Sequence, residues 1–344
     1  MANVTDPNKP RVVVTGASGH IGANLVRELA GRGYRVSALV RESSRALDGI
    51  GVQKIAGDIL DLQSLRGAFR GADQVYHLAA FTSMQPGDYK KMESVNIEGT
   101  KNVLRACRSE GVSTLAYFSS THVLQQAPGD RAVTEQSPLI SRKRKDAGVY
   151  EYSKAMADRT VRDCDNTALS TRILYPSAVI GPNDFELSLM GQAILKMARS
   201  EFPVLVKGAY DWVDARDVSR GAVEAVEKGS GGDRYILSGH RVSISGFAGL
   251  VAELTGGKAP SLTCPTWLAK FFAPAVEKWA AWRGETPMYT RDALSAMDSP
   301  ALFSHSLATE QLGYRPRPFR RSVQDALLDY AKSHEVPGMK FNDG

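Results

Sequence analysis

Tyr150 and Lys154 are spaced to act as an acid–base pair. The segment around them is predicted to open a helix that runs to about Cys164, and residues four apart share one face of a helix. A phenol with a pKa of about 10 is a poor acid–base catalyst at neutral pH, because it rarely gives up its proton there. A neighbouring ammonium stabilises the phenolate, so we expect Lys154 to lower the pKa of Tyr150.

A hydroxyl group is predicted close to this pair. The run Phe-Ser-Ser-Thr over 118–121 ends a predicted strand, and open α/β sheets bind ligands at the carboxyl ends of their strands. Ser120 can hold a substrate carbonyl oxygen there, and Thr121 is the alternative hydroxyl. Tyr-x-x-x-Lys alone also occurs on surface helices, so the nearby hydroxyl is what favours a catalytic set of Ser120, Tyr150 and Lys154.

Three glycines follow the first predicted strand, residues 11–15, at the spacing Gly-x-x-Gly-x-x-Gly, and a helix predicted over 21–32 begins among them. They are Gly16, Gly19 and Gly22. Glycine lets the backbone turn tightly and approach a pyrophosphate closely. The first turn of the helix offers free N–H groups and the positive end of its dipole to the same anion. Glycines at this position of an alternating chain predict a nucleotide site.

Arg41 ends the second predicted strand, residues 35–41, at the position that faces the adenosine ribose in dinucleotide sites. A carboxylate at this position would accept hydrogen bonds from a free 2′-hydroxyl and repel a 2′-phosphate. The planar guanidinium of arginine does the reverse, because it can hold a phosphate. Arg45, four residues further on, can assist. The alternative is an exposed arginine at a strand end, and the charge favours NADP(H) over NAD(H).

The elements that carry these residues alternate along the first half of the chain. Strands are predicted over residues 11–15, 35–41, 52–56, 74–78 and 114–119, and helices over 21–32 and 88–109. Strands that alternate with helices pair in parallel through right-handed crossovers. We therefore expect an α/β fold with a Rossmann-type doubly wound parallel sheet. Past about Ile173 the alternation loosens, which predicts a smaller mixed α/β substrate region.

The length of 344 residues suits roughly two domains of about 150 residues, or one large α/β unit. We expect a dinucleotide-binding domain over 1–175, to which 211–237 returns, and a substrate-binding region over 176–344. Apolar residues make up 43% of the chain, and 43 Lys plus Arg stand against 37 Asp plus Glu, for a net charge of +6. This composition excludes a disordered chain.

Several classes of protein are disfavoured by what the sequence lacks. No stretch reaches the about 20 apolar residues of a membrane-spanning helix, and residues 1–10 have no apolar signal core. Cys107, Cys164 and Cys264 are far apart, which excludes a disulfide framework and argues against a structural metal. No nucleic-acid module accompanies the basic residues, so nucleic acid is not expected as a partner. We expect a cytoplasmic protein.

Taken together, these motifs resemble the extended short-chain dehydrogenases/reductases, the NAD(P)-dependent epimerase/dehydratase superfamily. Within it they resemble the branch of dihydroflavonol reductases and 3β-hydroxysteroid dehydrogenases. The resemblance spans nearly the whole chain and depends on the order and spacing of its segments. These are residues 15–22, 57–61, 77–80, 95–100, 119–120, 150–154, 175–182, 212–218 and 312–316.

The resemblance implies a role for each matching residue. Ser120 binds the substrate oxygen, Tyr150 exchanges the proton, and Lys154 holds the nicotinamide ribose while tuning the phenol. Asp58 accepts from the adenine amino group, whereas Asn96 either fixes the long helix near the site or caps backbone groups in the core. The residues implied to contact the cofactor are Gly16, Ser18, Gly19, His20, Ile21, Gly22, Arg41, Asp58, Ile59, Leu78, Ala79, Ala80, Tyr150, Lys154, Pro176 and Val179.

We expect an NADP(H)-dependent oxidoreductase that reduces a carbonyl group, or oxidises the alcohol, of a bulky, apolar small molecule. Tyr150 is its proton donor or acceptor. Thr121-His122 stands where family dehydratases have Asp-Glu, and Arg41 argues against an epimerase that recycles NAD. The alternatives are an NAD-dependent nucleotide-sugar epimerase and a non-catalytic NADP(H)-sensing protein. The family also implies a homodimer, formed through the helix over 88–109 and the Tyr150 helix.

Two segments stay open between interpretations. The basic run 142–145 is either a solvated loop or a docking patch for an anionic substrate handle such as coenzyme A. Apolar residues over 267–279 recur at helical spacing around Pro274, which should kink the helix. They pack in the core, cover a hydrophobic substrate as a lid, or contact a membrane surface beside neighbouring basic residues.

Overall fold

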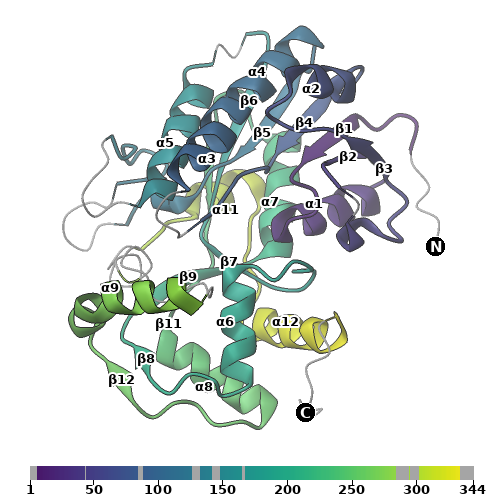
Figure 1. Cartoon of the computed structure of the whole chain (residues 1–344). Coiled ribbons are helices and arrows are strands. Elements are labelled where there is room, and N and C mark those ends of the chain that lie inside the picture. Colours follow the sequence, from purple (N-terminus) through teal and green to yellow (C-terminus); the bar gives the residue numbers. More distant parts are fainter. Residues whose placement is uncertain are drawn as a thin grey trace.

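A computed structural model describes residues 6–42, 44–83, 88–125, 132–141, 148–164, 167–283, 294 and 302–333, apart from the side chains of 149, 277–283 and 333. Its centre is a seven-stranded parallel sheet in the order β10-β6-β5-β4-β1-β2-β3 (Figure 1). The strands are β1 (Arg11–Thr15), β2 (Arg35–Val40), β3 (Gln53–Ala56), β4 (Gln74–His77), β5 (Thr114–Phe118), β6 (Ser170–Pro176) and β10 (Arg234–Leu237). The predicted doubly wound parallel sheet is confirmed.

Helices cover both faces of this sheet (Figure 1). One face carries α2 (Leu62–Phe69), α4 (Gly99–Ser109) and α5 (Val149–Arg162), and the other carries α1 (His20–Gly31), α7 (Ala215–Lys228) and α11 (Ser306–Leu312). Side chains alternate along β1, so Val13 packs with the first set, whereas Val12 and Val14 pack with the second. Burial on both faces explains why the central strand β1 has an unbroken apolar run over 12–14.

The helix predicted over 88–109 consists of three parts. α3 (Tyr89–Met92) leads into a π-helical turn, η2 (Glu93–Glu98), which continues into α4. Within η2, Asn96 is buried and hydrogen-bonded to groups outside the helix. A π-helical turn inside a helix often marks a functional site. The apolar spacing predicts the helix but carries no signal for this turn.

The second region is small and mixed, as the sequence predicts, and lies below the main sheet in Figure 1. Its strands are β7 (Ala178–Ile180), β9 (Ala209–Asp214) and β11 (His240–Ser243) in one sheet, and β8 (Leu205–Val206) and β12 (Thr263–Cys264) in another. Its helices are α6 (Leu189–Ala198), α8 (Ile244–Thr255), α9 (Thr266–Arg283) and α12 (Phe319–Ser333). Trp212 packs edge-on against Phe247, with 4.7 Å between ring centroids, at the centre of a separate apolar core.

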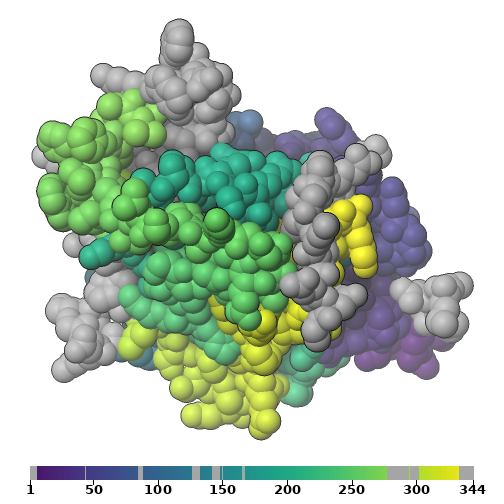
Figure 2. Space-filling view, turned by 90° about the horizontal axis from the view of Figure 1, so that it is seen from below, coloured from purple at the N-terminus to yellow at the C-terminus, as the bar shows by residue number. Residues whose placement is uncertain are grey.

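Three elements from the second half of the chain, α7, β10 and α11, pack with the main sheet. β10 pairs in parallel with β6, and α11 contacts both α7 and β10. Seen from below (Figure 2), residues of the second half of the chain, coloured green and yellow, fill most of the surface.

None of the helices among the described residues is long and apolar enough to cross a membrane. The described residues also hold no group of three or more His, Cys, Asp or Glu side chains placed to bind a metal ion.

Candidate active site

Two adjoining cavities lie at the carboxyl ends of the central strands, where open α/β sheets bind ligands. The first has a volume of about 470 Å³ and the second of about 510 Å³. We call them the Arg41 cavity and the Tyr150 cavity after a lining residue of each. Gly16, Gly19 and Ala80 line both, so the two cavities meet at the glycine loop.

The glycine loop is packed too closely for side chains at two of its positions. Gly16 has a φ of +69°, and a Cβ there would lie 2.6 Å from the Ala79 nitrogen. A Cβ on Gly22 would lie 2.1 Å from the Gly16 carbonyl oxygen. Gly19 caps α1 without a side-chain hydrogen bond, so the first N–H groups of the helix face the cavity. This loop fits a pyrophosphate group.

The Arg41 cavity has the charges expected around an adenosine. Arg41 follows β2, is exposed, and forms no ion pair with a carboxylate in the part of the chain that the structure describes. Asp58 follows β3 and lines the same cavity beside Ile59. Arg45 lies in the short helix η1 (Arg45–Leu47) and is not among the lining residues of either cavity, so the structure gives no support to its assisting Arg41.

The Tyr150 cavity brings the three predicted catalytic residues together. Ser120, Tyr150 and Lys154 all line it, beside Pro176 and Val179. Ser120 is the second residue after β5, whereas the phenol and the ammonium come from the first two turns of α5. The carboxyl end of a central strand and the start of the next crossover helix therefore build one site, as the motif spacing predicts.

Ser120, rather than Thr121, lines the cavity. Ser120 Oγ accepts a hydrogen bond from the His122 N–H at 3.3 Å, which leaves its own proton free to donate. Thr121 is buried, and its Oγ1 donates to the Pro176 carbonyl at 3.4 Å. Ser119 also lines the cavity, and its buried Oγ has no hydrogen-bond partner within the described residues. Because an unpaired buried hydroxyl is costly, this atom fits a polar group of a bound ligand.

Lys154 is buried and held by the end of β5. Its Nζ donates to the Phe118 carbonyl at 2.6 Å and lies 4.8 Å from the centroid of the Tyr117 ring. Burial lowers the pKa of Lys154 to about 8, and the negative charge of Asp158 opposes that shift. The ammonium is thus fixed in position and still carries most of its charge at neutral pH.

The pKa of Tyr150 moves in the direction opposite to our expectation. Burial raises it to about 12, and the carboxylate of Glu151 adds to the rise. A hydrogen bond with the Thr82 side chain acts the other way and stabilises the phenolate. Burial is the largest cause of the shift, and Lys154 is not among the groups that contribute to it, since its ammonium donates to the Phe118 carbonyl. The predicted effect of Lys154 on the phenol stays a prediction.

Asn96 ties the loop after β4 to the helix that carries Tyr150. Its Oδ1 accepts from the Phe81 N–H at 2.8 Å, and its Nδ2 donates to the Phe81 carbonyl at 3.1 Å. The same Nδ2 donates to Ser153 Oγ at 2.9 Å. The side chain thus pairs with backbone groups and also joins η2 to α5, so features of both sequence interpretations are present in the structure.

His77 is a buried polar residue for which the sequence suggested no role of its own. Its Nδ1 lies 2.8 Å from Thr15 Oγ1, and its Nε2 lies 3.1 Å from Thr100 Oγ1. Burial lowers the pKa of His77 to about 3, and the positive charge of Lys154 adds to the effect. The ring is therefore neutral at physiological pH and joins β1, β4 and α4 beneath the site.

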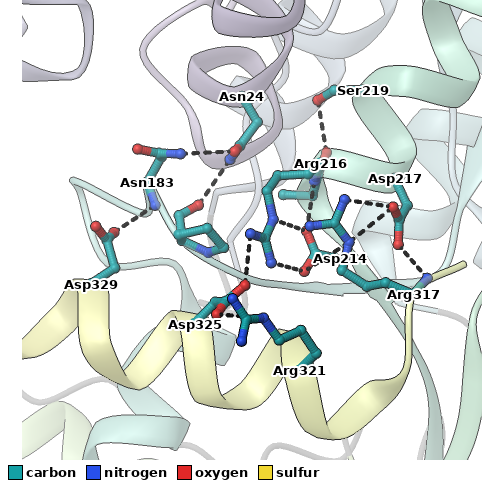
Figure 3. Close-up of polar contacts among 12 residues, drawn as sticks. Asn24, Asn183, Asp214, Arg216, Asp217, Ser219, Arg317, Arg321, Asp325 and Asp329 are labelled. Carbon is teal, nitrogen blue, oxygen red and sulfur yellow. Dashed lines mark hydrogen bonds and ion pairs between the residues drawn. The ribbon is translucent and has the colours of Figure 1, made fainter.

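Polar contacts join the glycine-loop helix to the second region (Figure 3). Asn24 of α1 donates to the Pro182 carbonyl at 2.9 Å and accepts from Asn183 Nδ2 at the same distance. The Asn183 N–H in turn donates to Asp329 of α12 at 2.6 Å. His20 lines the Tyr150 cavity, with its Nε2 3.2 Å from the Pro182 carbonyl oxygen. These contacts hold the start of α1 against the segment after β7.

The basic residues near the C-terminal end are largely paired with carboxylates. Arg317 bonds Asp217 at 2.8 Å, and Arg321 lies 3.1 Å from Asp325 (Figure 3). Asp325 also pairs with Arg216 at 2.8 Å. The Arg216–Asp325 pair thus joins α7 to α12. The basic run 142–145 lies outside the described residues.

Among the α9 side chains that the structure describes, 266–276, the large aromatic rings do not pack in the core. Trp267 and Phe271 are 70% and 73% exposed, whereas Ala273 is buried, and the side chain of Trp279 lies outside the described residues. The core-packing interpretation is therefore wrong for these aromatic rings. The second region does line the Tyr150 cavity, but through Leu189 and Met190 at the start of α6. Apolar spacing alone could not distinguish α6 from α9 as the cavity wall.

Comparison with known proteins identifies the family. Residues 12–238 match the sequence profile of the NAD dependent epimerase/dehydratase family. The chain is 33% identical to sterol demethylase protein B of Methylococcus capsulatus over 321 residues, which cover 92% of this chain and 96% of that protein. It is 30% identical over 326 residues to 4-hydroxy-2-methyl-3-oxo-4-farnesyl-3,4-dihydroquinoline-1-oxide ketoreductase of Stigmatella aurantiaca, covering 92% of this chain and 95% of the relative.

A solved structure agrees with this assignment. The crystal structure of gox2253 is 30% identical in sequence and superposes with a TM-score of 0.82, covering 96% of this chain and 100% of that one. The glycine loop, the sheet order and the match over most of the chain therefore lead to the same conclusion. The chain belongs to the NAD-dependent epimerase/dehydratase family of extended short-chain dehydrogenases/reductases, and it is an NAD(P)-dependent oxidoreductase.

Proposed function

We propose that this oxidoreductase uses NADP(H) and reduces a carbonyl group of a bulky, apolar small molecule. The observation that carries the proposal is that Ser120, Tyr150 and Lys154 line one cavity, which meets the glycine loop at Gly16 and Gly19. Groups suited to proton transfer and groups suited to cofactor binding therefore share a single site.

In this proposal Tyr150 is the proton donor. A bound nicotinamide dinucleotide supplies the hydride that the carbonyl carbon receives. Tyr150 transfers its phenolic proton to the carbonyl oxygen as that oxygen gains negative charge, and Ser120 donates a hydrogen bond to the same oxygen. Lys154, one turn further along α5, supplies a positive charge that favours the phenolate left behind. The carbon gains a hydride and the oxygen gains a proton, so the product is an alcohol.

The protonation of Tyr150 favours the reducing direction. With a pKa of about 12, the phenol carries its proton at neutral pH and can donate it at once. Alcohol oxidation needs the phenolate, which is scarce at that pH. Lys154, with a pKa of about 8, keeps most of its charge at pH 7 and can assist the phenol in either direction.

The choice of NADP(H) is supported by the free guanidinium of Arg41. Its side chain lines the cavity next to the end of β2, where the adenosine ribose lies in dinucleotide sites. A guanidinium with no carboxylate partner among the described residues can form two hydrogen bonds to a 2′-phosphate. Asp58 lines the same cavity, and in this proposal it accepts from the adenine amino group.

The substrate class is inferred from the cavity wall. Leu189 and Met190 form it together with Val179 and Phe118, and such a wall favours an apolar ligand. The names of two relatives refer to compounds that are bulky and apolar, as this wall favours. One relative is named sterol demethylase protein B, and the other is a ketoreductase named for a farnesyl-bearing 3-oxo compound.

A substrate panel tests the proposed function. Purified protein is mixed with NADPH and, in turn, with steroid, flavonoid and long-chain ketones, small polar ketones and nucleotide sugars. We expect NADPH consumption with one or more of the bulky ketones and little with the small polar ones. Epimerisation of a nucleotide sugar with retained NAD and no net NADPH consumption would identify an epimerase instead. Tight NADPH binding without turnover of any class would indicate a sensing protein.

A further inference from the structure

Phe81 is fixed close to the point where the two cavities meet. It follows Ala80, which lines both cavities, in the loop after β4. Asn96 holds both the N–H and the carbonyl of Phe81, and Asn96 is itself buried and bonded to Ser153 of α5. The aromatic ring is therefore carried by a doubly anchored backbone, and it forms part of the wall of the Arg41 cavity.

Lys91 of α3 places an ammonium group over this ring. Its Nζ lies 4.2 Å from the centroid of the Phe81 ring, which is a cation–π contact. Lys91 is exposed, lines the Arg41 cavity, and forms no ion pair with a carboxylate in the part of the chain that the structure describes. Its neighbour Lys90 is exposed as well but is not among the lining residues of either cavity. The cavity wall thus holds a cation with no carboxylate partner among the described residues.

We propose that Lys91 binds the pyrophosphate of the dinucleotide from the side of the β4 loop, while the glycine loop binds it from the side of β1. The proposal rests on the dinucleotide site proposed above. An ammonium on a flexible stem is well suited to a phosphate, because it presents a compact charge with three donors. An exposed cation–π contact is weaker than a charge-assisted hydrogen bond to phosphate, so the ammonium can leave the ring for the anion.

The position of Lys91 favours the pyrophosphate over the 2′-phosphate. The pyrophosphate joins the two halves of the cofactor and so belongs where the two cavities meet, at Gly16 and Ala80. The Lys91 ammonium contacts the ring of Phe81, which follows Ala80, whereas Arg41 lies at the end of β2. The two cations therefore have separate tasks. Lys91 strengthens binding of NADH and NADPH alike, and Arg41 distinguishes between them.

Equilibrium titrations with three probes test this division. NADPH, NADH and ADP-ribose, which has the pyrophosphate but neither nicotinamide nor a 2′-phosphate, are titrated against the full chain by change in protein fluorescence. Lys91→Gln should weaken all three by a similar factor, about five- to tenfold, because each has the pyrophosphate. Lys91→Arg should restore most of the affinity, and the matched control Lys90→Gln should stay within about twofold of wild type. Thermal unfolding midpoints show that each variant is folded.

Three results would overturn the proposal. Unchanged affinities in Lys91→Gln would remove Lys91 from the site, and a loss confined to NADPH would assign it to the 2′-phosphate. An equal loss in Lys90→Gln would reduce the effect to general surface charge. Failure of the wild-type protein to bind any of the probes would instead refute the dinucleotide site itself, and the proposed function with it.

Discussion

Replacing Arg41 by alanine tests the basis of cofactor choice. The side chain is exposed at the end of β2 and has no carboxylate partner among the described residues, so its removal leaves no buried charge behind. A charge-assisted hydrogen bond is worth about 1.5–3 kcal/mol, and solvent screening at an exposed site puts this one in the lower part of that range. A loss of about 1.5–2 kcal/mol corresponds to NADPH binding that is about 10- to 30-fold weaker.

The assay is a pair of fluorescence titrations, with NADPH and with NADH, on wild type, Arg41→Ala and Arg45→Ala. Arg45 is the matched control, since it is also exposed and nearby but is not a lining residue of either cavity. We expect the NADPH affinity to fall only in Arg41→Ala, and the NADH affinity to change by less than about twofold in both variants. Equal losses of NADPH and NADH affinity in Arg41→Ala would refute the assignment of Arg41 to the 2′-phosphate.

Two further substitutions test the protonation states of the site. Thr82→Val removes a hydrogen bond that lowers the pKa of Tyr150, so alcohol oxidation at pH 9 should fall about tenfold while ketone reduction at pH 7 changes less; equal losses in both directions would contradict this. Folded His77, with a pKa of about 3, excludes a proton that the unfolded chain binds below about pH 6.5, so stability falls as the pH falls. In urea unfolding, the free energy of unfolding of wild type should fall by about 2 kcal/mol more than that of His77→Gln between pH 7 and pH 5. Equal decreases in the two proteins would rule out this histidine as the source of the pH dependence.

The sheet and the glycine loop could be predicted because their signals are local. Apolar runs such as Val12-Val13-Val14 alternate with helical spacing, and the glycines follow the first run directly. The positive φ of Gly16 and the close approach of Gly22 to its carbonyl show why these positions need glycine. The catalytic candidates could be placed in one site for a similar reason, because strand ends and the following helices converge in this fold.

The features that the sequence could not predict depend on contacts between distant segments. The pKa of Tyr150 is raised mainly by burial and is lowered by the loop residue Thr82, neither of which its own motif encodes, although the motif residue Glu151 adds to the rise. The ammonium of Lys154 is engaged by the Phe118 carbonyl, a backbone group without a sequence signal. Lys91 lines the Arg41 cavity and contacts the Phe81 ring, whereas Lys90 lines neither cavity, and nothing in the local sequence separates these two adjacent lysines.

The same limit applies to the second region. The helical spacing over 267–279 predicts α9 correctly but does not tell which of its faces is covered. Trp267 and Phe271 lie at the surface, whereas Leu189 and Met190 of α6 line the cavity. Which helix borders a site depends on how the small sheets pack, and periodicity within one helix holds no information on that.

The most direct test of the central claim is the rate of NADPH oxidation by Tyr150→Phe with a ketone that the wild-type protein reduces. The substitution keeps the ring and removes only the hydroxyl. Loss of a positioned proton donor should lower the rate by at least about 10²-fold, while the NADPH affinity stays within about twofold of wild type. A rate within about threefold of wild type would contradict proton transfer by Tyr150, and with it the mechanism proposed for this site.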